Sequence, residues 1–251
     1  MIGLEPGSAP QEKPPLFKRA ADLVRGLYRD EWTMWNAHYK RYFGIAAWAL
    51  ALGFIIGFVY FAIRPEQEKK AFAFFIRSLR DIPLGASPLV LAMTLFYHNA
   101  RAAAAAAAFG IIPFARLSIL YPLANGAALG LVASISKRQG LNVPLLFLKI
   151  VAPHGVFELP AFLYATSVGL YLSISLGKKA LAARRKKKED RAPLTPAPTG
   201  APGGFLDSYP ERAEADRGTL WADVFQSFLL VVLPLLLVAA FVEGFITPLL
   251  G

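Results

Sequence analysis

The 251-residue sequence contains no cysteine and only three histidines, His38, His98 and His154. Without cysteine, the chain can form neither a disulfide framework nor a metal site built on thiolates. The first forty residues also lack the short basic start, apolar core and small-residue cleavage site of a secretory signal. We therefore expect the N-terminal segment to remain on the protein.

Acidic residues are also scarce, with 17 Asp and Glu against 27 Lys and Arg, which gives a formal net charge of +10. Such a charge could indicate a nucleic-acid partner. However, the basic residues are concentrated in segments that border apolar tracts, where they face anionic lipid and fix membrane orientation. We therefore predict the lipid bilayer as a partner and no nucleic acid.

What the sequence has in abundance is hydrophobic residues, which form 55% of the chain and occur in long tracts. A helix needs about 20 mostly apolar residues to cross a hydrocarbon core of roughly 30 Å. The sequence therefore predicts an all-α fold, a polytopic transmembrane helix bundle with about five spans plus short interfacial amphipathic helices. The expected spans are 42–63, 88–113, 114–136, 154–176 and one within 219–251, and the expected interfacial helices are 66–80 and 144–151.

The segments outside the bundle of residues 42–176 differ in composition. Residues 1–41 begin with a Pro-, Gly- and Glu-rich stretch at 1–15, where we expect disorder, and continue as an amphipathic helix. Residues 177–218 carry a basic run and then many Pro and Gly residues, which predicts a flexible loop.

Lysine and arginine are distributed unevenly among these segments. They number 7 before the first span and 10 between the fourth and fifth, against 5 and 3 in the two loops expected on the other side. The positive-inside rule then places the N-terminus and the 177–218 loop in the cytoplasm, and the protein in the inner membrane as a multi-pass protein.

Small residues mark helix faces that can approach closely. Gly53 and Gly57 lie four residues apart, seven consecutive alanines follow Arg101, and Gly126 and Gly130 repeat the spacing. Because lipid gives no hydrophobic drive for association, such thin faces favour close packing between spans. We expect the tracts 88–113 and 114–136 to pack against each other.

Charged side chains inside a membrane are unfavourable by about 2.5–3.5 kcal/mol on insertion scales, so each requires a partner or a role. His154 and Glu158 are four residues apart and share one helix face. We predict one polar cluster in the outer half of the bundle, which either locks the helices together or serves a function. Its expected members are His154, Glu158, Glu243, Asn99 and Arg101.

Other chemistry has weaker support. A metal site would need a third and a fourth ligand beyond His154 and Glu158, and their spacing is not the two-histidine pattern of zinc proteases. No motif links Thr166, Ser167 or Thr247 to His154 as a nucleophile. His38 and His98 are typical of interfacial side chains. We predict no catalytic residue, no metal and no cofactor.

Residues 151–161 read V-A-P-H-G-V-F-E-L-P-A, which resembles the signature segment of the stage II sporulation protein M family. The Asn99 and Arg101 pair, the Asn125-Gly126 pair and the closing E-G-F-I-T-P at 243–248 support the resemblance. It covers roughly residues 70–250, and the insertion at 177–218 is individual to this chain. The resemblance carries over Pro153, His154, Gly155 and Glu158, and in second place Asn99 and Glu243. The Asn125-Gly126 pair is counted with the motif residues.

The resemblance implies a non-enzymatic membrane protein, a scaffold or anchor for a cell-envelope assembly that remodels peptidoglycan. Its expected partners are envelope proteins, among them peptidoglycan-degrading enzymes, with a homo-oligomer as a further option. The alternative is a small-solute or proton-coupled transporter or channel that uses the intramembrane Glu, His and Arg residues. A third interpretation is an intramembrane hydrolase that activates water with His154 and Glu158.

Overall fold

The computed structural model describes residues 16–78, 87–189 and 217–247, and almost all of these residues are helical, without a strand among them. The predicted all-α fold is confirmed. Three expectations lie outside the described residues: disorder at 1–15, the end of the interfacial helix at 79–80, and the Pro- and Gly-rich part of the loop at 190–216.

The described residues form nine α-helices. Helices α1 to α5 are Leu16–Met34, Lys40–Ile63, Pro65–Ser78, Pro88–Ala108 and Leu120–Arg138. Helices α6 to α9 are Val143–Leu146, Ala152–Glu189, Arg217–Ser227 and Leu233–Phe241. Four π-helical segments directly adjoin these helices in the chain. They are Trp35–Tyr39, Phe147–Val151, Phe228–Val232 and Val242–Ile246.

Four helical runs among the described residues are long and apolar enough to cross a membrane, and they identify a membrane protein. They are Phe17–Ile63, Leu117–Arg138, Val143–Lys187 and Leu220–Ile246. Helix α4, the expected second span, is not among them, although its 21 residues are enough to cross. Its polar residues His98, Asn99 and Arg101 lower its hydropathy.

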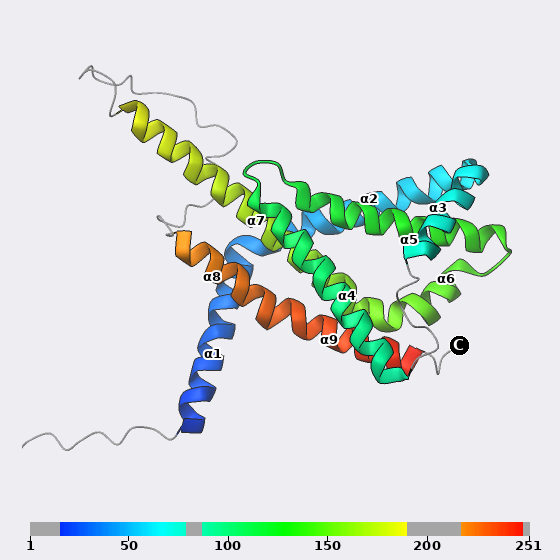
Figure 1. Cartoon of the computed structure of the whole chain (residues 1–251), viewed down its shortest axis with the longest axis horizontal. Helices are drawn as coiled ribbons and strands as arrows, with labels where there is room; N and C mark the ends of the chain where they lie inside the picture. The colour runs from blue at the N-terminus through cyan, green and yellow to red at the C-terminus, as the bar shows by residue number, and fades with distance from the viewer. Residues whose placement is uncertain (1–15, 79–86, 190–216, 248–251) are drawn as a thin grey trace, which may run out of the picture.

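Helices α2 and α5 form the closest pair in the molecule. Gly53 lies against the backbone of Leu123, and four residues later Gly57 lies against Ala127. Because residue numbers rise together along the contact, the two helices run parallel. Figure 1 shows them side by side. The prediction that Gly53 and Gly57 allow close helix packing is confirmed, because both let the backbones of α2 and α5 approach each other.

The expected packing of tract 88–113 against tract 114–136 is wrong. The thin face of α5, at Gly126 and Gly130, packs on the backbone of α2 instead. The alanine-rich helix α4 packs on α7 and α9, with Gly110 against Gly169. The separation arises because α4 ends at Ala108 and an irregular turn with two left-handed residues redirects the chain before α5.

Helix α7 differs from expectation at both ends. It continues to Glu189, so the first part of the expected flexible loop at 177–218 is helical. Alanine, lysine and arginine, which dominate this part, are all strong helix formers. At its start, the expected helices 144–151 and 154–176 are one helical run, with a π-helical segment before Pro153. In Figure 1 the chain changes direction there, so the proline and π-helical segment bend the run instead of ending it.

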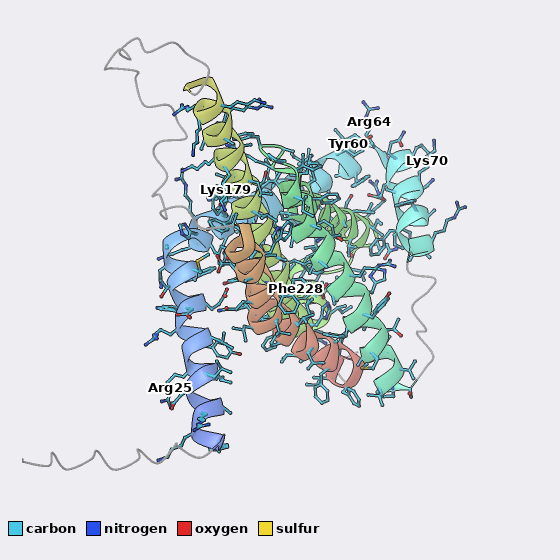
Figure 2. All side chains as sticks on the ribbon, turned by 60° about the vertical axis from the view of Figure 1, so that its left-hand side comes forward. Arg25, Tyr60, Arg64, Lys70, Lys179 and Phe228 are labelled. Carbon is cyan, nitrogen blue, oxygen red and sulfur yellow. The ribbon has the colours of Figure 1, made fainter. Side chains whose placement is uncertain are left out.

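The core of the bundle lies along α7. Every residue from Ala161 to Ile174 is buried, and α2, α4 and α9 surround this stretch. Helix α1 projects away from the other helices (Figure 1). Figure 2 shows Arg25 on this projecting helix, far from Arg64 and Lys70, which lie where α2 gives way to α3.

Candidate functional site

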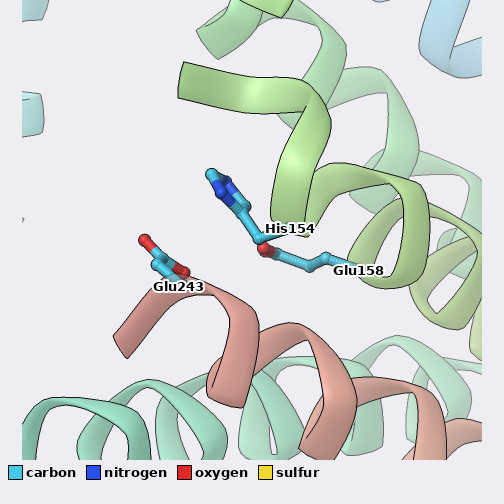
Figure 3. Close-up of side chains that lie close together, drawn as sticks. All are labelled: His154, Glu158 and Glu243. Atoms are coloured by element: carbon cyan, nitrogen blue, oxygen red, sulfur yellow. The ribbon is translucent and has the colours of Figure 1, made fainter. Parts of the chain in front are cut away.

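Three of the predicted polar residues meet where the start of α7 approaches the end of the last helical run. His154 and Glu158 lie one turn apart on α7, and Glu243 lies on the π-helical turn that follows α9. One ligand atom from each of the three residues can be chosen so that all lie within 4.8 Å of one another. Figure 3 shows the three side chains in the space between the two elements.

The start of α4 packs against the turn that carries Glu243. Gly244, next to Glu243, is buried against α4, and a Cβ added to it would lie 2.8 Å from the Cβ of Ala92 and from the carbonyl oxygen of Pro88. The absence of a side chain at Gly244 therefore lets the last turn sit on the start of α4. This contact helps to position Glu243 opposite His154.

The three side chains are half-buried, and their charges interact. His154 lies close enough to Glu243 for electrostatic attraction, while Glu158 and Glu243 repel each other. Two carboxylates at this spacing repel unless a proton, an imidazolium or a metal cation lies between them. In addition, Nδ1 of His154 is buried and has no hydrogen-bond partner within the described part of the chain.

The other two predicted members of the cluster lie on α4. Arg101 is exposed, and its charge acts on Tyr121 of α5. Asn99 is half-buried and lies two residues before Arg101, so the two side chains leave the helix in nearly opposite directions. Both lie beyond the turn of α4 that contacts Gly244. The structure therefore joins three of the five residues and directs Arg101 elsewhere.

The motif residues have positions that explain their types. Pro153 follows the π-helical segment at the bend before the buried part of α7, and Gly155 is buried one turn before Leu159. Gly126 lies against the backbone of Leu50 on α2, and its neighbour Asn125 is half-buried. The Asn125-Gly126 pair therefore belongs to the α2–α5 contact and not to the three-residue cluster.

A second polar site, which the sequence did not indicate, centres on Glu31 at the end of α1. Glu31 is only 5% exposed and accepts a hydrogen bond from the hydroxyl of Tyr164 on α7. The hydroxyl of Ser227 on α8 lies 3.1 Å from the Glu31 carboxylate and 3.2 Å from the hydroxyl of Tyr39. This network joins three helices that are distant in sequence.

A cavity of about 360 Å³ opens beside Glu31. Five aromatic side chains line it, namely Tyr28, Trp32, Trp35, Phe43 and Tyr164. Three of these aromatics recur at helical spacing along α1 and the segment after it, which is the sequence signal that could have indicated this site. Glu31 itself gives no signal, because exposed charges surround it in the sequence.

A third polar contact ties α3 to the end of α5. Glu68 is 5% exposed, and it accepts a hydrogen bond of 2.9 Å from Nε of Arg138 and one of 2.5 Å from the Ser134 hydroxyl. Burial alone would raise the pKa of Glu68. The hydrogen bonds from Arg138 and Ser134, together with the Arg138 charge, outweigh that effect and lower the pKa below its usual range.

A family model described as Stage II sporulation protein M matches residues 45–248. The matched region begins within α2, contains α3 to α9, and includes all three members of the His154, Glu158 and Glu243 cluster. No curated protein and no solved structure matches the chain significantly.

Proposed function

The chain belongs to the stage II sporulation protein M family, and from this premise we propose that it is a non-enzymatic scaffold or anchor for a cell-envelope assembly that remodels peptidoglycan. The observation that carries the proposal is the extent of the match, which runs from within α2 to the last turn of the final helical run. On this proposal the hydrolytic chemistry belongs to partner enzymes, and the bundle holds them at the membrane.

The bundle suits this role because its helices are held at close contacts and defined positions. The α2–α5 pair meets backbone to backbone at its glycines, and the Glu68 contact with Arg138 fixes the next helix to the same pair. The three-residue cluster connects α7 to the end of the last helical run. A rigid bundle of this kind presents a constant outer surface, which is what docking a partner requires.

We further propose that the protein lies in the inner membrane with its N-terminus in the cytoplasm. The distribution of lysine and arginine supports this orientation. Since α2 and α5 run parallel, the chain must return across the membrane between them, and α4 is the helix long enough to do so. The contacts of α4 with α7, at Gly110 and Gly169, support five crossings with α4 as the second.

The test of the scaffold is affinity purification of the tagged protein from its own host in mild detergent. Wild type is compared with Glu158→Ala, and Glu66→Ala, an exposed carboxylate on α3, is the matched control. The scaffold predicts that envelope proteins or peptidoglycan-active enzymes co-purify with wild type and the control, and are lost from Glu158→Ala at equal membrane levels. A well-inserted wild type that brings down no such protein would argue against it.

A transporter or proton-coupled channel is the second candidate, because two carboxyl groups and an imidazole meet inside the bundle. It predicts solute or proton flux in proteoliposomes that contain the purified protein alone. It also predicts that Glu158→Gln abolishes the flux, whereas Glu66→Gln does not. The scaffold predicts no flux from either protein, so this experiment separates the two.

A further inference from the structure

The cluster of His154, Glu158 and Glu243 presents the donor set of a metal site. The sequence supplies two donors, an imidazole nitrogen and a carboxylate oxygen one helical turn apart, and folding adds a second carboxylate from the last helical run. Imidazole and carboxylate together suit zinc and related divalent transition metals. Such sites commonly use three protein ligands and leave a fourth position for water or another group.

The geometry requires only a small adjustment. The three potential ligand atoms lie within 4.8 Å of one another, whereas two ligands of one tetrahedral zinc ion lie about 3.4 Å apart. Both carboxylates are at the end of flexible side chains, and both side chains are half-buried, so rotation can close the gap without moving the helices. Partial exposure also leaves a path for an ion to enter.

A second observation points to a ligand independently of the carboxylates. Nδ1 of His154 is buried without a hydrogen-bond partner among the residues that the structure describes. Buried polar atoms are nearly always paired, so a buried imidazole nitrogen without a protein partner is suited to bind an ion or a water molecule. An imidazole nitrogen in this state, beside two carboxylates that repel each other, is consistent with a cation in their midst.

We propose that His154, Glu158 and Glu243 bind one divalent transition-metal ion of the zinc type. The ion neutralises the two carboxylates and links the start of α7 to the last turn of the chain, with a fourth position open to water or to a side chain of a partner. This proposal does not rest on the scaffold function, because an ion can bind whether or not a partner docks.

The test uses the full chain, purified in detergent and stripped of metal with a chelator. Zn²⁺ is titrated against a competing indicator, and bound Co²⁺ is followed by its visible absorption, which reports a site of nitrogen and oxygen ligands. Wild type is compared with His154→Gln, Glu158→Gln and Glu243→Gln, each of which replaces a ligand by an amide of similar size. His98→Gln and Glu66→Gln are the controls, since neither residue lies in the cluster.

Wild type and both controls are expected to bind one Zn²⁺ per chain, and each cluster variant is expected to bind it at least about tenfold more weakly. Zn²⁺ should also raise the unfolding temperature of wild type more than that of the variants. Gel filtration identifies any variant that fails to fold, and the remaining variants then decide. Absence of stoichiometric binding in wild type, or binding that the folded cluster variants retain at full strength, would overturn the proposal.

Discussion

Gly57 of α2 lies so close to Ala127 of α5 that a Cβ added to Gly57 would be 2.7 Å from the Cα of Ala127. No real side chain tolerates that distance without movement of one backbone. In lipid, where apolar surface gains little from association, such close approach supplies the dispersion contacts that hold two helices together. The α2–α5 pair therefore depends on this glycine.

Replacement of Gly57 by leucine should separate the pair and lower the free energy of unfolding by about 1–3 kcal/mol or more, because the added side chain overpacks a backbone contact. Gly44→Leu in the same helix is the control, since a Cβ there meets nothing within 4 Å. Denaturant unfolding in detergent, followed by circular dichroism, gives both values. Equal stability of the two variants would contradict the role assigned to the glycine.

The hydrogen bond between Tyr164 and Glu31 gives a second prediction. Tyr164→Phe removes the donor and leaves a buried carboxylate with fewer partners, so the free energy of unfolding should fall by about 1–3 kcal/mol. The matched control is Tyr97→Phe, since Tyr97 is 68% exposed. Denaturant unfolding in detergent, followed by circular dichroism, measures both variants. A loss no greater than that of the control would show that the network adds no stability.

The lowered pKa of Glu68 predicts a pH dependence with a definite sign. A carboxyl group whose pKa is lower in the folded protein stabilises it above the pKa of the unfolded chain, and this stabilisation is lost as pH falls through the folded value. Wild type should therefore exceed Glu68→Gln in unfolding free energy by about 1.5–3 kcal/mol at pH 7. The difference should shrink as pH falls from about 5 toward 3.

Unfolding of both proteins across this pH range, with Glu66→Gln as the exposed control, checks the prediction. Glu66 is largely exposed and forms a surface ion pair with Lys69, so its variant should follow wild type closely at every pH. A gap between wild type and Glu68→Gln that stays constant down to pH 3 would argue against the ion pair with Arg138 as its source.

The lack of cysteine makes the proposed topology directly testable. Single cysteines at Gln139, Ile112 and Ala182, all exposed, can be labelled in intact cells with a membrane-impermeant thiol reagent. We predict that Gln139→Cys is labelled in intact cells, and that Ile112→Cys and Ala182→Cys are labelled only after permeabilisation. Labelling of Ile112→Cys in intact cells would mean that α4 does not cross the membrane.

Most of the fold could be predicted from the sequence because its strongest signal, apolar runs of membrane length, depends on few contacts between distant residues. The predicted packing of α4 against α5 is wrong because small residues indicate a helix face that can approach another helix closely, but they do not indicate which helix that is. Gly126 lies against the backbone of α2, and a glycine allows such close approach to any helix. The left-handed residues Phe114 and Arg116 in the turn before α5 redirect the chain away from α4. The helical end of α7 differs from the expected loop because the Pro- and Gly-rich composition that predicts a loop begins only after the basic run, and lysine and arginine themselves favour helix.

The candidate site was predictable where residues share a helix turn and unpredictable where they do not. His154 and Glu158 lie on one face by spacing alone, while the approach of Glu243 depends on how the last helical run crosses α7. Glu31 and Glu68 gave no signal, because each lies in a charged amphipathic segment and is buried only by helices that are distant in sequence. Arg101 was expected in the cluster, and its position on the α4 helix directs it toward Tyr121.

The most direct test of the scaffold is photo-crosslinking in the native host membrane. A photoreactive amino acid replaces Val156, which is 63% exposed and lies between His154 and Glu158, and in a parallel strain replaces Ile55, which is 57% exposed on α2. The scaffold predicts that Val156 crosslinks to an envelope protein with a domain outside the membrane, and that the Ile55 position does not yield the same product. Crosslinks to lipid alone at Val156, in cells where the protein is well inserted, would contradict the scaffold.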